Sequence, residues 1–195
     1  MGLDAPQMEK TAMNIPNLLS LSRILSVPIF ILLMLDPSPL RSLIAGIVFS
    51  LASITDWLDG YLARKWGQVT KMGKLLDPIA DKILVTSALV MLVDIGSIDS
   101  WKAILIIGRE FAVTGLRTIA LSDGIVIPAE TVGKYKTGAQ ITVVISLLLY
   151  RHMDQKWMFE LGQAALWLAI VLAIFSAVQY FMSYWKRLNS DANTK

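Results

Sequence analysis

Six long apolar runs separated by short turn signals constrain the fold of this chain more than any other feature. A helix needs about 20 predominantly apolar residues to span the hydrocarbon core of a bilayer, and 55% of the 195 residues are hydrophobic, more than is usual in soluble domains. The runs are too long, and alternate too little, for the strands of a membrane barrel. We therefore predict an all-α polytopic membrane protein with six transmembrane helices, over residues 17–35, 40–66, 75–95, 101–121, 133–150 and 157–185.

The connections between the runs are too short to hold a separate soluble domain. We expect one membrane-embedded domain over residues 1–195, with an interfacial arm at residues 1–16 and a flexible tail at residues 189–195. Lysine and arginine gather after the second, fourth and sixth runs: Arg64, Lys65, Lys71 and Lys74; Lys134 and Lys136; Lys186 and Arg187. Because cytoplasmic loops carry the excess of positive charge, both termini are predicted to be cytoplasmic.

Charge and cysteine content exclude several kinds of chemistry. The formal net charge of +3 gives little support to nucleic-acid binding. The chain has no cysteine, which excludes disulfides, thiolate metal sites and cysteine nucleophiles. Any chemistry must therefore come from carboxylates, hydroxyls and basic side chains.

Two groups of carboxylates interrupt the lipid-compatible sequence at helical spacing. The first group places two acids and two small residues on one helix face, at offsets of zero, three, four and seven: Asp56, Asp59, Gly60 and Ala63. The second group repeats the pattern at steps of four on the next predicted helix: Gly73, Asp77 and Asp81. The small residues leave the backbone open to a bulky ligand. Because charge within a membrane is costly, the two groups together predict a functional site.

The connection between these two helices, residues 65–72, is short enough to bring the two acidic faces together near the cytoplasmic headgroups. Four carboxylates at close range cannot all ionise without cations, and oxygen ligands favour hard ions such as Mg²⁺ or Mn²⁺. Two such ions can bridge the phosphates of a substrate. Arg64 lies next to the small residues and can donate a charge-assisted hydrogen bond to a phosphate.

The run from Asp56 to Asp81 resembles the signature of the CDP-alcohol phosphotransferase (CDP-alcohol phosphatidyltransferase) family, D-x2-D-G-x2-A-R-x8-G-x3-D-x3-D, at every position. The resemblance implies a six-helix, homodimeric membrane enzyme that transfers a substituted phosphate from a CDP-linked lipid or alcohol to an acceptor hydroxyl and releases CMP. It implies that Asp81 is the general base, and that two Mg²⁺ or Mn²⁺ ions are held by four acids: Asp56, Asp59, Asp77 and Asp81. By the same resemblance, the CDP-lipid is bound by Asp56, Gly60, Ala63, Arg64, Gly73 and Asp77.

Four further bases suit a pocket for an anionic acceptor, on whose phosphate the fork of an arginine fits well: Arg109, Arg117, Lys134 and Lys136. Glu110 follows Arg109 but points about 100° away from it on a helix, so its role is left open. Near the start of the first helix, Asn17, Ser20 and Arg23 can supply polar contacts or act as caps and anchors. His152 falls in a predicted outside loop, and we assign it no chemistry.

The segments at residues 14–23, 108–117 and 133–140 look like those of the phosphatidylglycerophosphate synthase branch of the family. That likeness implies the transfer of a phosphatidyl group from CDP-diacylglycerol to sn-glycerol 3-phosphate, whose phosphate the four bases would bind. It also implies an integral plasma (inner) membrane enzyme whose site faces the cytoplasm.

Other readings of the sequence stay open at this point. Within the family, the acceptor could be an inositol phosphate, phosphatidylglycerol or serine, although serine leaves several bases unexplained. Outside it, four aspartates could serve a divalent-cation transporter, but such sites usually lie near the membrane midplane. A membrane scaffold with paired charges gives no reason for the small residues in register.

Overall fold

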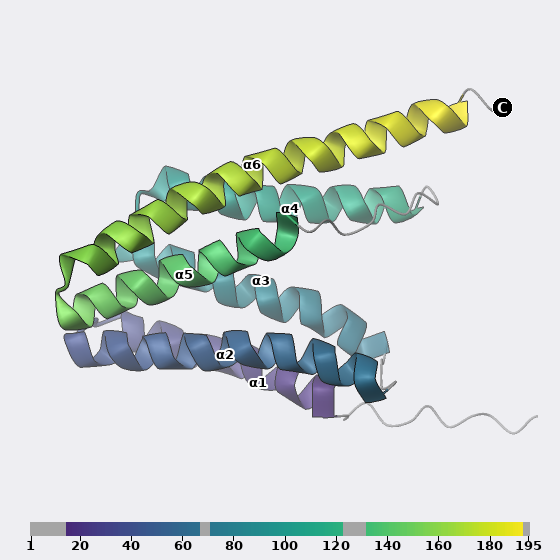
Figure 1. Ribbon diagram of the computed structural model, residues 1–195. Coiled ribbons are helices and arrows are strands. Elements are labelled where there is room, and N and C mark those ends of the chain that lie inside the picture. The colour runs from purple at the N-terminus through teal and green to yellow at the C-terminus, as the bar shows by residue number, and fades with distance from the viewer. Residues whose placement is uncertain (1–14, 67–70, 123–131, 193–195) are drawn as a thin grey trace, which may run out of the picture.

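The computed structural model describes residues 15–66, 71–122 and 132–192, and within them the side chains of residues 18–56, 58, 65, 79–122 and 135–187. The described residues form six α-helices and no strand (Figure 1). The helices are α1 Ile15–Met34, α2 Pro39–Trp66, α3 Lys71–Asp94, α4 Ser100–Ser122, α5 Val132–Met153 and α6 Lys156–Ala192. The predicted all-α class and the six helices are confirmed.

Two helix bounds differ from those predicted by four residues or more. Helix α3 begins at Lys71, before the predicted start at residue 75, and α6 continues to Ala192, past residue 185. An apolar run ends where charged residues begin, but the hydrogen bonds between residues i and i−4 continue into polar sequence. The helices therefore extend beyond the predicted spans where they carry charges at their ends.

The helices pack around one apolar core. Helix α1 contacts α2 and α3, α5 contacts α2 and α6, and α4 contacts α6 and α3. The large apolar side chains that are fully buried include Phe30, Met34, Phe49, Leu89, Leu92, Leu147, Leu148 and Leu166. Gly162 allows α6 to approach α5 closely, because a Cβ atom there would lie 2.7 Å from Leu147 Cδ2.

The outer faces of the helices carry many exposed apolar side chains, among them Leu25, Leu32, Leu51, Ile104, Val171 and Phe181. Two of the described helices contain segments that are long and apolar enough to cross a membrane: Pro39–Asp56 in α2 and Lys156–Arg187 in α6. Exposed apolar side chains on such helices suit contact with lipid. These two features together are typical of a membrane protein.

The two ends of the bundle differ in what they contain. The starts of α1, α3 and α5 and the ends of α2, α4 and α6 share one end, which we call the motif end because the acidic motif lies there (Figure 1). At the opposite end, Arg151 donates to the carbonyl oxygen of Pro37 at 3.4 Å, and His152 Nδ1 lies 3.1 Å from that of Pro39. These contacts join the end of α5 to the turn between α1 and α2 and to the first residue of α2.

Candidate active site

The acidic motif occupies the end of α2 and the start of α3. The backbone is helical through both segments, so the spacing that predicted one acidic face on each helix is present. The side chains of Asp56 and Asp81 are described. The other predicted motif side chains lie outside the described residues, and their roles stay predictions: Asp59, Gly60, Ala63, Arg64, Gly73 and Asp77.

Arg23 of α1 forms an ion pair with Asp56, in which its Nη1 donates to Asp56 Oδ1. The Arg23 side chain is 0% exposed. A buried guanidinium is costly unless it is paired, so this pair fixes α1 beside the motif. From the sequence, Arg23 could be a cap, an anchor at the membrane surface or a polar contact. An anchor is expected at the end of a helix, whereas Arg23 lies within α1, between Ser22 and Ile24.

Asp81 of α3 lies near charged groups from four other helices. It is half-buried, and the charges that act on it are those of Asp56, Arg23, Glu110 and Lys136. These groups come from α2, α1, α4 and α5 in turn. The structure therefore brings the last acid of the motif close to its first acid and to one of the predicted acceptor bases.

The described carboxylates fit a divalent cation by their chemistry. Asp56 and Asp81 repel one another, and their oxygens are the hard ligands that Mg²⁺ and Mn²⁺ prefer. Within the described side chains, no group of three or more acidic, histidine or cysteine residues could hold a metal. Two of the four predicted ligands, Asp59 and Asp77, lie outside that set.

Glu110 joins two of the predicted acceptor bases. Its Oε1 accepts from the ammonium group of Lys136, which is only 5% exposed, and lies 3.5 Å from Arg109 Nη1. The pair with Arg109 forms although the two residues diverge on the helix, because both side chains are long enough to bend toward each other. Glu110, whose role was left open, is thus the shared partner of Arg109 and Lys136.

The other acceptor candidates are placed differently. The guanidinium of Arg109 also reaches α6, where Nε donates to the Ala173 carbonyl at 3.2 Å and Nη2 to Ser176 Oγ at 2.5 Å. Arg117 is exposed on α4, two turns beyond Arg109. The Lys134 side chain lies outside the described residues. Only Arg109 and Lys136 are brought together among the candidates that can be placed.

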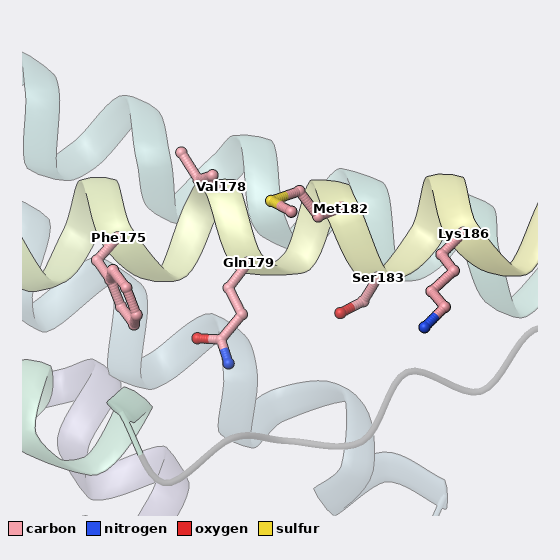
Figure 2. Close-up of a pocket in the computed structure, with 6 residues that line it drawn as sticks. All are labelled: Phe175, Val178, Gln179, Met182, Ser183 and Lys186. Carbon is pink, nitrogen blue, oxygen red and sulfur yellow. The ribbon is translucent and has the colours of Figure 1, made fainter.

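A hollow of about 460 Å³ lies along the C-terminal half of α6. Its described lining is Phe175, Val178, Gln179, Met182, Ser183 and Lys186. Figure 2 shows Gln179, Ser183 and Lys186 pointing to the same side of the helix. Neither Asp56 nor Asp81 lines this hollow, so it is separate from the described part of the acidic motif.

Comparison with known proteins decides the family. A sequence model of CDP-alcohol phosphatidyltransferases matches residues 13–175, which include the whole acidic motif and the segments around Arg109 and Lys136.

The chain belongs to the CDP-alcohol phosphatidyltransferase family.

Several relatives within the CDP-alcohol phosphatidyltransferases are similar over nearly their full length. A Bacillus subtilis (strain 168) protein is 42% identical over 190 residues, which cover 91% of this chain and 98% of the relative. A Pseudomonas fluorescens protein is 41% identical, covering 92% and 94%, and a Rickettsia bellii (strain RML369-C) protein is 40% identical, covering 86% and 93%. All three are named CDP-diacylglycerol--glycerol-3-phosphate 3-phosphatidyltransferase. The family predicted from the motif is confirmed.

Proposed function

We propose that this chain transfers the phosphatidyl group of CDP-diacylglycerol to sn-glycerol 3-phosphate, giving phosphatidylglycerophosphate and CMP. The observation that carries the proposal is the near full-length identity to relatives named for this reaction. The closeness of Asp56 on α2 to Asp81 on α3 supports it, because carboxylates from two helices could hold the metal ions that neutralise a pyrophosphate.

In this proposal the primary hydroxyl oxygen of glycerol 3-phosphate forms a bond to the phosphorus that carries diacylglycerol. The bond from that phosphorus to the oxygen of CMP breaks, and Asp81 takes the proton of the hydroxyl. Asp56, Asp59, Asp77 and Asp81 would hold two Mg²⁺ or Mn²⁺ ions, which supply positive charge to the pyrophosphate. Arg23 holds Asp56 in place from α1.

The CDP-lipid would bind along the motif face of α2 and the start of α3. Gly60, Ala63 and Gly73 leave room for the cytidine diphosphate, and Arg64 donates to a phosphate. Asp56 and Asp77 complete the predicted set. The acyl chains would remain in the bilayer while the nucleotide lies at the membrane surface.

The phosphate of the acceptor would be bound by Arg109 and Lys136, with Arg117 and Lys134 at the mouth of the site. Support comes from the shared contact of Arg109 and Lys136 with Glu110, which holds two cations in one region of a membrane protein. The exposed position of Arg117 suits a first contact with an anion arriving from water.

We further propose that the chain is one membrane domain with six spanning helices, both termini in the cytoplasm and the motif end facing the cytoplasm of the plasma membrane. Positive side chains at the motif end support this orientation, among them Lys65, Arg117, Lys186 and Arg187. At the opposite end, Arg41 and Lys102 are paired with Asp36 and Asp99. We expect a homodimer by analogy with the family.

The test uses the purified full chain in detergent with CDP-diacylglycerol, Mg²⁺ or Mn²⁺, and a panel of acceptors. CMP release and the lipid product are measured for glycerol 3-phosphate, inositol phosphate, serine and phosphatidylglycerol. We expect CMP and phosphatidylglycerophosphate with glycerol 3-phosphate. CMP with another acceptor alone would overturn the proposed acceptor, and no CMP with any acceptor would overturn the enzyme assignment and leave a cation transporter to be tested.

A further inference from the structure

A small cavity of about 20 Å³ lies between α3, α4 and α5, directly beside Asp81. Polar side chains from all three helices line it: Asp81, Lys82, Thr86, Glu110, Lys136, Thr137 and Gln140. Valine, leucine and isoleucine side chains form the apolar part of its wall. The cavity thus connects the predicted general base with a predicted phosphate-binding lysine.

The polar groups of this wall differ in whether they have a partner. Lys82 Nζ donates to Thr114 Oγ1, and Lys136 is paired with Glu110. Gln140 is 3% exposed, and its Nε2 is shielded from solvent without a hydrogen-bond partner among the described residues. The amide of Gln140 is therefore the buried donor in this wall that still needs an acceptor.

Buried amide groups are rarely left without a partner, because burial removes their bonds to water without replacing them. A cavity of about 20 Å³ has room for one water molecule or one hydroxyl group. A hydroxyl can accept from Gln140 and donate to a carboxylate of the same wall. The size and the polarity of the cavity both suit a single hydroxyl-sized occupant.

We infer that Gln140 binds the secondary hydroxyl of glycerol 3-phosphate, an inference that rests on the proposed function. The acceptor carries its attacking hydroxyl on one end carbon, its phosphate on the other and the secondary hydroxyl between them. The cavity wall likewise holds Asp81 for the attacking hydroxyl, Lys136 for the phosphate and Gln140 one turn along α5 from Lys136. Gln140 is thus a residue that selects a glycerol-based acceptor.

The experiment compares glycerol 3-phosphate with 3-hydroxypropyl phosphate, which lacks only the secondary hydroxyl. For the unaltered chain we expect kcat/KM to be roughly 10-fold to 100-fold higher with glycerol 3-phosphate, because the deoxy acceptor leaves a buried donor unpaired. In Gln140→Met, which keeps the length of the side chain but removes the amide, the preference should fall to about 3-fold or less. Gln140→Leu should give the same result.

The preference is a ratio measured within one preparation, so partial misfolding of a variant does not affect it. The inference also requires that both variants retain most of their activity on 3-hydroxypropyl phosphate, because that acceptor makes no use of the amide. Equal loss with both acceptors, or loss of all activity, would overturn the inference and indicate that Gln140 holds a structural water. Equal use of the two acceptors by the unaltered chain would overturn it as well.

Gln163→Met is the matched control, since Gln163 Nε2 already donates to the Ser97 carbonyl at 2.9 Å, away from the motif end. Its preference for glycerol 3-phosphate should equal that of the unaltered chain. A failure of the proposed function is detected separately: the unaltered chain would then release no CMP with glycerol 3-phosphate. Failure of the inference leaves CMP release from glycerol 3-phosphate by the unaltered chain intact.

Discussion

Arg23 of α1 and Asp56 of α2 lie 33 residues apart in the sequence and form an ion pair at the first acid of the motif. The arginine is fully buried, whereas the Asp56 side chain is 37% exposed. Helix α1 contributes no residue to the family signature, yet through this pair it contacts the acidic site directly. The site thus depends on a helix that the motif does not contain.

Replacing Arg23 by methionine should destabilise the protein by roughly 1–2 kcal/mol, because the change removes an ion pair whose arginine is fully buried and whose aspartate is 37% exposed. Thermal unfolding in detergent measures the loss, and CMP release should fall with it. Arg41→Met is the control, since Arg41 pairs with Asp36 at an exposed site where such pairs contribute less than about 1 kcal/mol. Equal effects of the two changes would contradict a structural role for the buried pair.

Asp81→Asn should lower kcat by roughly 10²-fold to 10⁴-fold, because the amide cannot take the proton of the attacking hydroxyl. Binding of CDP-diacylglycerol, measured by calorimetry in detergent, should change little. Asp59→Asn, at a predicted metal ligand, should weaken that binding instead. If Asp81→Asn lost nucleotide binding as severely, Asp81 would act mainly as a ligand rather than as the base.

Glu110→Gln should raise the KM for glycerol 3-phosphate about tenfold and leave kcat within about threefold, because Lys136 and Arg109 lose the carboxylate that positions them. Initial rates over a range of acceptor concentrations separate the two constants. Glu160→Gln, at an exposed position near the start of α6, is the matched control and should change neither. A change in the KM for CDP-diacylglycerol alone would place Glu110 at the other substrate.

Gly162→Ala should destabilise the α5–α6 contact by roughly 1–3 kcal/mol, because its Cβ atom would meet Leu147 Cδ2 and Cγ at 2.7 Å and 2.8 Å. Thermal unfolding in detergent measures the effect. Gly115→Ala is the control, because no atom lies within 4 Å of a Cβ atom at that position on α4. It should be neutral or stabilise the helix by up to about 1 kcal/mol. The Leu147→Ala change should partly rescue Gly162→Ala, and the absence of rescue would mean that a different contact is strained.

The class of fold and the number of helices were predictable because both follow from runs of apolar residues, a property of the local sequence. The position of Arg23 was not, since the contact that explains it joins residues from different helices. Glu110 shows a similar limit: its helical angle separates it from Arg109, but the flexible side chains close the gap. Gln140 carries no local signal, because its unpaired amide is defined by the packing of three helices.

The roles of the motif side chains were predicted by resemblance to the family. For most of them, the local sequence alone could not have assigned a role. Asp56 and Asp59 are the same chemical group at neighbouring positions of one face. Of the two motif acids whose side chains are described, Asp56 forms the ion pair with Arg23, and Asp81 lies near Glu110 and Lys136. For these two acids, the tertiary neighbours differ although the residue type is the same.

The contacts of Arg151 with the turn between α1 and α2, and of His152 with the first residue of α2, also bear on how the protein is made. These pairs span 114 and 113 residues of sequence. During synthesis, the first two helices therefore leave the ribosome long before α5 is available to hold their turn. The aspartates of α2 and α3 are likewise made before Glu110 and Lys136. A chain interrupted before α5 carries the complete signature of the family but lacks part of the site.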